Sequence, residues 1–133
     1  MCDIIKKNTK TKGDIKYMDI RRYDILMADM SGAIGSEQGG LRPVIVIQNN
    51  LGNIHSSTTI VMPMTSKLKP SQPTHTLIKR NKDNNLKVDS VVLGEQIRTI
   101  SIERIKFKIG SVKDEKTQKE IRRVYEANFN FGE

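Results

Sequence analysis

Arg42 and Thr65 are the first residues to consider for chemistry, because each places a polar side chain at one end of an apolar run. Arg42 follows the glycines at positions 39 and 40 and precedes the run PVIVI. A planar guanidinium donates two parallel hydrogen bonds to a phosphate, and glycines let the backbone approach a ligand closely. Thr65 stands where the run TTIVMPM opens into a loop. On spacing alone both residues also have an ordinary explanation. A charge at the start of a strand is usually solvated, and a threonine is common at the end of a strand.

Further polar residues cluster at the ends of predicted strands. Gln48 and Asn49 end the run that Arg42 begins, and Glu95, Gln96 and Arg98 form a polar patch within an apolar stretch. Arg98 is most simply explained as half of an ion pair with Asp24. Arg42 begins the first run and Thr65 ends the second. We expect these two strand ends to lie near each other only if the strands run parallel; otherwise the loop must fold back.

Several kinds of catalytic site are excluded by what the sequence lacks. It has no P-loop, no dinucleotide fingerprint, no nucleophile elbow and no HExxH motif. No acidic cluster would hold two magnesium ions. His55 and His75 lie in very different surroundings, so we interpret them as unrelated rather than as an acid–base pair. The single cysteine, Cys2, predicts neither a disulfide framework nor a metal cluster, and we expect no cofactor.

The charge of the chain favours an anionic partner. Its 133 residues carry a formal net charge of +8, with few aromatic residues and no tryptophan. The scarcity of aromatics argues against a surface on which nucleic-acid bases stack. The longest apolar run is too short to cross a bilayer, and the N-terminus is interrupted by charges too early for a signal peptide. These features predict a cytoplasmic protein that does not enter a membrane.

The pattern of apolar residues predicts a β-rich (α+β) fold, a small β-barrel with a C-terminal helix. Residues 1–20 are predicted to be a basic, flexible extension, and residues 21–133 one domain. A long loop over 31–40 and a basic loop over 65–73 separate strands, and Gly94 divides or bends the stretch 87–100. Asp114 is the candidate N-cap of the final helix. The predicted strands span 23–30, 42–50, 58–64, 74–80, 87–100 and 106–110.

Three segments, GSEQGGLRPVIVIQNNLGN, PTHTLI and DSVVLGEQIRTI, resemble in order and spacing the MazF/PemK family of toxin endoribonucleases. The resemblance runs from about Arg22 to the C-terminal helix and does not include the N-terminal extension. The chain departs from the family before the first strand. The family usually has Arg-Gly-Asp there, whereas this chain has Arg-Tyr-Asp, with Tyr23 in place of the glycine.

The resemblance implies an SH3-like β-barrel of the MazF/PemK/CcdB type that assembles as a homodimer. It also implies sequence-specific, metal-independent cleavage of single-stranded RNA, mainly mRNA, leaving 2′,3′-cyclic phosphate and 5′-hydroxyl ends. Such a toxin inhibits translation and growth, and its partner is a MazE-like antitoxin. The family's catalytic arginine and threonine match Arg42 and Thr65. Whether Arg42 acts as base, acid or electrostatic stabiliser is left open.

Polar residues of the loops and strand ends are predicted to bind the RNA, because unpaired bases expose their Watson–Crick edges. These are Glu37, Gln38, Gln48, Asn49, Ser66, Thr74, His75, Ser90, Glu95 and Gln96. The alternative is a CcdB-like toxin that binds gyrase without ribonuclease activity. The absence of tryptophan and the ending NFNFGE weaken it. A third possibility is a non-catalytic RNA-binding barrel.

Overall fold

The computed structural model describes residues 19–67 and 71–132. The predicted extension therefore lies outside the described residues, apart from its last two positions. Ile20 is buried in a core cluster and so packs as part of the fold. The elements in chain order are β1 (Asp24–Asp29), β2 (Leu41–Val46), α2 (Asn50–His55), β3 (Thr58–Thr65), β4 (His75–Ile78), β5 (Ser90–Leu93), η2 (Gly94–Gln96), β6 (Arg98–Ser101), η3 (Ile102–Arg104), β7 (Ile105–Ser111) and α3 (Glu115–Ala127).

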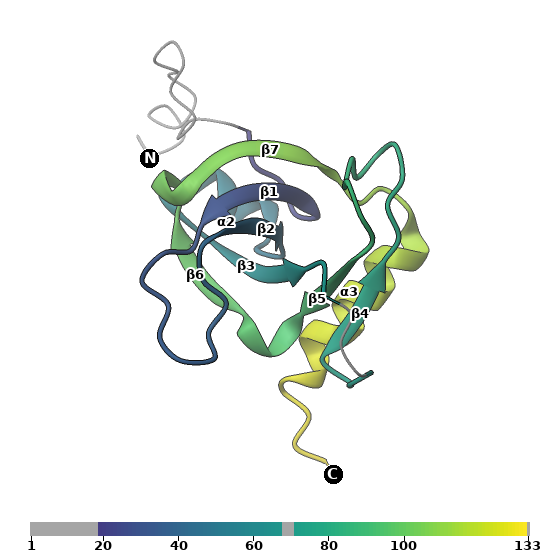
Figure 1. The fold of residues 1–133 in the computed structure, drawn as a ribbon. Helices are drawn as coiled ribbons and strands as arrows, with labels where there is room; N and C mark the ends of the chain where they lie inside the picture. The colour runs from purple at the N-terminus through teal and green to yellow at the C-terminus, as the bar shows by residue number, and fades with distance from the viewer. Residues whose placement is uncertain (1–18, 68–70, 133) are drawn as a thin grey trace.

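All seven strands belong to one curved antiparallel sheet (Figure 1). Their order is β4-β5-β3-β2-β1-β7, with β6 paired to β3. The predicted β-rich fold with a C-terminal helix is confirmed, but the sheet is open, since no ladder joins β4 to β7 among the described residues. The turn over 81–85 spans this gap. Ser111 N donates to Asp83 O at 3.0 Å, and Asn85 Nδ2 donates to Ile109 O at 3.1 Å.

Two hydrophobic clusters lie on opposite faces of the sheet, because successive strand side chains point to opposite sides. Val44, Val46 and Val61 belong to the first cluster, and Ile45, Met62 and Met64 to the second. The second is covered by α3 through Ile121 and Val124. Asp114 caps α3 as predicted, accepting a hydrogen bond from Thr117 N at 3.0 Å. Among the described residues no helix has both the length and the apolar character needed to span a membrane.

Gly94 divides the predicted stretch 87–100 into β5 and β6. Its N–H donates to Thr74 O at 2.8 Å, and η2 follows at once. A Cβ atom at this position would lie 2.4 Å from Val124 Cγ1 and 2.8 Å from Thr74 O. No side chain fits there, so glycine allows the chain to turn tightly between β4 and α3.

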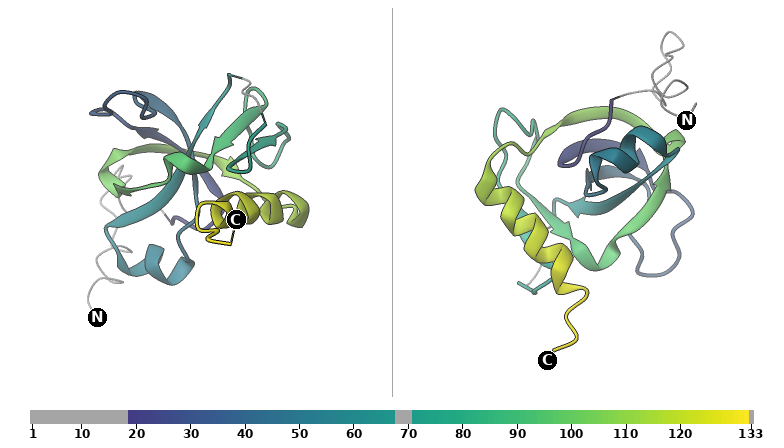
Figure 2. Two further views of the ribbon diagram at one scale, coloured as in Figure 1. Left: turned by 90° about the horizontal axis from the view of Figure 1, so that it is seen from below. Right: turned by 180° about the vertical axis from the view of Figure 1, so that it is seen from behind.

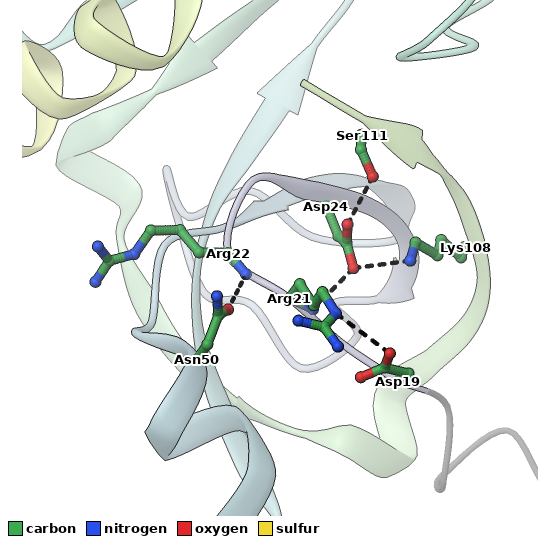
Figure 3. Close-up of polar contacts among 7 residues, drawn as sticks. All are labelled: Asp19, Arg21, Arg22, Asp24, Asn50, Lys108 and Ser111. Atoms are coloured by element: carbon green, nitrogen blue, oxygen red, sulfur yellow. Dashed lines mark hydrogen bonds and ion pairs between the residues drawn. The ribbon is translucent and has the colours of Figure 1, made fainter. Parts of the chain in front are cut away.

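The Arg-Tyr-Asp segment before β1 adopts the backbone conformation that favours glycine. Tyr23 has a φ of 75°, and its ring packs against the second cluster. The neighbouring Asp24 is buried and accepts hydrogen bonds from Arg21 N at 2.8 Å and Ser111 Oγ at 2.6 Å (Figure 3). Its charge is paired with Lys108 Nζ at 3.0 Å. The predicted ion pair of Asp24 with Arg98 is therefore wrong.

Candidate active site

The start of β2 and the end of β3 lie side by side, because these two strands run antiparallel. Our expectation that only parallel strands would bring Arg42 and Thr65 together was wrong, since β2 begins where β3 ends. Val44 pairs with Pro63. Beyond this pair, the Arg42 side chain reaches the end of β3, where its Nη1 donates to the carbonyl of Met64, the residue before Thr65. The two predicted catalytic residues thus lie near each other on neighbouring strands.

The Arg42 guanidinium is held in a fixed plane by two backbone carbonyls. Its Nε donates to Gly39 O at 2.9 Å and its Nη1 to Met64 O at 3.2 Å. A guanidinium has five N–H donors, so three are left without a partner among the described residues. Burial lowers the pKa of Arg42 below its ordinary value. The side chain is therefore a partly desolvated, oriented cation with hydrogen-bonding capacity to spare.

Thr65 is nearly buried beside Arg42, with 9% of its surface exposed. Its Oγ1 accepts a hydrogen bond from Lys67 N at 3.2 Å, which fixes the hydroxyl where β3 opens into the loop. The hydroxyl hydrogen has no acceptor within the described part of the chain. Thr65 can therefore donate one hydrogen bond to a bound group.

The glycine-rich loop over 31–40 is tied to η2. Gln38 N donates to Gln96 Oε1 at 3.3 Å, and Gln96 Nε2 donates to Ser36 O at 3.4 Å. Within the loop, Glu37 Oε1 accepts from Ile34 N. The Gln96 amide is therefore engaged with the loop backbone at both of its ends, which gives it a supporting role that the sequence did not suggest.

A cavity of about 730 Å³ lies between this loop and η2. Arg42 lies next to this cavity. Its guanidinium donates to the carbonyls of Gly39 and Met64, and the residues just before these two in the sequence, Gln38 and Pro63, belong to the cavity wall. This wall therefore contains four of the predicted RNA-binding residues. The lining residues are Gly32, Ile34, Ser36, Glu37, Gln38, Pro63, Glu95, Gln96, Ile97 and Arg98.

Two more predicted residues, Thr74 and His75, form a connected group with Glu95 of the cavity wall. Thr74 Oγ1 donates to Glu95 Oε1 at 3.1 Å, and His75 Nε2 lies 3.0 Å from Glu95 Oε2. Burial opposes ionisation of Glu95, but the hydrogen bonds from His75 and Thr74 outweigh it and lower the pKa of the carboxyl below its ordinary value. Glu95 is thus an ionised acceptor at neutral pH.

The two predicted serines also lie at the Thr65 end of β3. Ser66 is exposed and follows Thr65 directly. Thr65 pairs with Val91, so Ser90 lies beside Ser66, but Ser90 is buried and its hydroxyl donates to Val88 O at 3.0 Å. Of the two, only Ser66 presents its side chain to solvent.

Gln48 and Asn49 lie at the opposite end of β2, about 20 Å from Arg42 at the rise of an extended strand. Gln48 Nε2 donates to Asn53 Oδ1 and to Thr58 O, each at 3.1 Å. Asn49 caps α2, accepting from Gly52 N at 2.7 Å. Both line a second cavity of about 750 Å³ with Tyr125 and Phe129. Their role in RNA binding stays a prediction, at a place remote from Arg42.

Sequence reasoning missed two arginines that support the site. Arg104 Nη1 donates to Asp29 O at 3.0 Å and to Ser31 O at 3.1 Å, which anchors the base of the glycine-rich loop. Arg123 of α3 donates to Pro73 O at 3.0 Å and to His75 O at 3.4 Å, which anchors the start of β4. Both act on backbone carbonyls far away in sequence, so no local pattern marks them.

Comparison with known proteins decides the family. Residues 21–127 match the PemK-like, MazF-like toxins of type II toxin–antitoxin systems. The chain belongs to this family. The Endoribonuclease MazF of Staphylococcus saprophyticus is 46% identical over 98 residues, which cover 73% of this chain and 81% of that relative.

Solved structures of the family share the fold. MazF from Deinococcus radiodurans superposes with a TM-score of 0.72 at 20% identity, covering 84% of this chain and 97% of that one. A mycobacterial endoribonuclease in complex with its cognate antitoxin gives a TM-score of 0.69 at 18% identity, covering 86% and 98%. The departure from the family at Tyr23 therefore leaves the fold intact.

Proposed function

We propose that this chain, an endoribonuclease toxin of the MazF type, cuts single-stranded mRNA at a specific short sequence without a metal ion. The 2′-hydroxyl passes its proton to solvent water as its oxygen bonds to the adjacent phosphorus. The bond from phosphorus to the 5′-oxygen breaks, and that oxygen takes up a proton. The products are a 2′,3′-cyclic phosphate and a 5′-hydroxyl. The observation that carries the proposal is the Arg42 guanidinium, oriented by two carbonyls and still able to donate.

Arg42 supplies electrostatic stabilisation of the transition state, where negative charge accumulates on the phosphate oxygens. A guanidinium fork donates two parallel hydrogen bonds to such oxygens. Preorganised donors of this kind contribute about 3–4 kcal/mol each in other enzymes. Burial lowers the pKa of Arg42, but the guanidinium keeps its charge, so it acts on the phosphate as a charged hydrogen-bond donor. A role as general base is opposed by the cationic state that arginine keeps in proteins.

Thr65 orients the phosphate that Arg42 holds. Thr65 ends the neighbouring strand β3, and Arg42 donates to the carbonyl of Met64 just before it. A hydrogen bond from the Thr65 hydroxyl to a non-bridging oxygen would fix the phosphate relative to the guanidinium. Glu37, Gln38, Glu95 and Gln96, which line the adjoining cavity, would contact the bases next to the cut. The surplus of lysine and arginine adds a salt-dependent attraction to the RNA backbone.

The partners we propose are a MazE-like antitoxin and a second copy of this chain. The solved complex of a mycobacterial endoribonuclease with its cognate antitoxin supports the first. The second is supported by exposed apolar side chains around the 750 Å³ cavity, on α2 and at the end of α3. These include Leu51, Ile54, Tyr125 and Phe129.

Light scattering should give twice the chain mass, and Phe129→Ser should lower the measured mass. The cytoplasmic location stays a prediction.

The decisive experiment incubates the purified protein with a long RNA in EDTA and identifies the ends of the fragments. Cyclic phosphates at a recurrent short sequence are expected, and strict dependence on added magnesium would contradict the proposal. A substrate with a single deoxyribose before the cut should resist cleavage, because it lacks the attacking hydroxyl. Cleavage of that substrate at the same bond would exclude the mechanism.

A further inference from the structure

His75 is placed where RNA cannot reach it, although the sequence suggested it as a direct contact. Only 7% of its surface is exposed, and its Nδ1 is buried without a hydrogen-bond partner in the described part of the chain. Its other nitrogen, Nε2, points to Glu95 Oε2 at 3.0 Å. A carboxylate only accepts, so Nε2 carries the proton. The imidazole thus has one strong contact, and that contact is to a residue of the cavity wall.

Both oxygens of the Glu95 carboxylate accept hydrogen bonds from residues at the start of β4. His75 Nε2 donates to Oε2, and Thr74 Oγ1 donates to Oε1 at 3.1 Å. Arg123 of α3 fixes this segment in turn by donating to the carbonyls of Pro73 and His75. The Glu95 side chain keeps 41% of its surface exposed while the imidazole keeps 5%. The carboxylate also accepts a hydrogen bond from its own backbone N–H, so one of its roughly four acceptor sites remains available to a ligand in the cavity.

We propose that His75 is a positioning residue that aims the Glu95 carboxylate at the amino group of one unpaired RNA base, so that this position of the recognised sequence is adenine, cytosine or guanine rather than uracil. The inference rests on the proposed function. A carboxylate can only accept, and the one donor on the Watson–Crick edge of uracil, N3–H, lies between two carbonyl oxygens that repel a carboxylate. Adenine, cytosine and guanine each present an exocyclic amino donor. The buried imidazole lets Glu95 hold one geometry before RNA binds, as a specificity contact requires.

The test first establishes the recognised sequence with the wild-type protein. Each amino-bearing base is then replaced singly by its amino-free analogue. Purine riboside stands for adenosine, inosine for guanosine, and the 2-pyrimidinone riboside for cytidine. At one position the wild type should lose about tenfold to one-hundredfold in kcat/KM, the amount expected for a hydrogen bond to a charged group. If no position shows this loss, the inference is overturned.

The variants then ask whether His75 acts through Glu95. In Glu95→Gln and His75→Ala the penalty for the missing amino group should shrink to less than about threefold, because the acceptor is absent or no longer aimed. His75→Gln, which keeps a donor nitrogen for Glu95, should restore the penalty. The matched control is His55→Ala, which removes the chain's other histidine from the exposed end of α2.

Thermal unfolding of each variant separates loss of fold from loss of positioning. A merely structural His75 would lower stability and activity on every substrate equally, with the amino-group penalty unchanged, and that result would overturn the inference. Failure of the proposed function is visible earlier and separately, since the wild-type protein would then leave every RNA intact in EDTA.

Discussion

Strand β2 has an arginine near each end, and the two are used differently. Arg22, just before β1, is exposed and donates from Nε to Ile47 O at 3.0 Å, where β2 has ended. Arg42, at the start of β2, donates to Gly39 O and Met64 O and is partly buried under the glycine-rich loop. Figure 2 shows this loop and α2 at opposite ends of the molecule. An arginine thus donates to backbone carbonyls at each end of β2, but only Arg42, at the loop end, is partly desolvated.

The polar groups around the two ends differ in the same way. Near Arg22, Asn53 is buried and joins Gln48 and Thr59 in a closed set of hydrogen bonds. Near Arg42, the guanidinium and the Thr65 hydroxyl retain donors without a partner among the described residues. A closed set of hydrogen bonds stabilises a fold, whereas spare donors beside a cavity are suited to binding. Polar residues at a strand end thus need their partners counted before a function is assigned to them.

Replacing Arg42 should have the largest effect. Arg42→Ala removes the oriented donor and should lower kcat by about 10²–10³-fold. Arg42→Lys should also lose most activity, because an ammonium is a point charge without the planar fork. Cleavage rates on a fixed RNA in EDTA measure both. Arg22→Ala is the matched control, removing an arginine-to-carbonyl bond at the other end of β2. Equal losses of activity for Arg22→Ala and Arg42→Ala would show that the two ends of β2 do not differ in function.

Thr65 should give the next largest effect. Thr65→Ala removes the hydroxyl that we expect to hold the phosphate, and kcat/KM should fall by about tenfold to one-hundredfold. Thr65→Ser keeps the hydroxyl and should recover most of the activity. The melting temperatures of both variants show whether the loss follows the missing oxygen or a weakened β3. Full activity of the alanine variant would remove Thr65 from the site.

At the other end of the strand, Asn53→Ala should change stability rather than catalysis. Asn53 Oδ1 accepts from Gln48 Nε2 at 3.1 Å and Thr59 Oγ1 at 2.8 Å, and its Nδ2 donates to Gln48 O at 3.0 Å. Buried partners left unsatisfied should lower the free energy of unfolding by about 1–3 kcal/mol. Urea unfolding measures this, while kcat/KM of the folded variant should match the wild type. A catalytic loss comparable to that of Thr65→Ala would show that the two ends are not independent.

The smallest effect is expected at Tyr23, beside the Gln48 end of β2. Tyr23→Ala and Tyr23→Gly both remove the ring from the second cluster, so their difference isolates the backbone. At a φ of 75° the glycine variant should be more stable by about 1 kcal/mol, because a Cβ atom is strained in the left-handed region. Chemical unfolding of the two variants side by side measures it. An alanine variant as stable as the glycine variant would mean that this segment relaxes.

Local sequence features predicted much of the fold. Runs such as PVIVI and TTIVMPM correspond to β2 and β3, and Asp114 begins the last helix, because apolar runs and helix caps depend on neighbouring residues. Strand direction depends on contacts between distant residues, so our expectation for the ends of β2 and β3 was wrong. The ion pair of Asp24 was misassigned to Arg98 for the same reason, since Lys108 reaches it only through the pairing of β1 with β7.

The residues of the candidate site stay predictions, and the sequence did not give their partners or their exposure. Arg42 and Thr65 came from a resemblance in sequence, which identifies residues without giving their partners. Which side chains are exposed is decided by packing, so His75 and Ser90 could not be recognised as buried beforehand. Arg104 and Arg123 were missed because each acts on carbonyl groups dozens of residues away.

The open sheet has a consequence for how the chain behaves at high concentration. An unpaired strand edge is a template on which another chain can add a strand and begin to aggregate. Here the outer edge of β7 meets the turn over 81–85, and exposed Lys106 repels a second copy of the same strand. The other edge strands, β4 and β6, have four residues each and are too short to support much pairing. The described fold can therefore leave its sheet unclosed and still resist edge-to-edge aggregation.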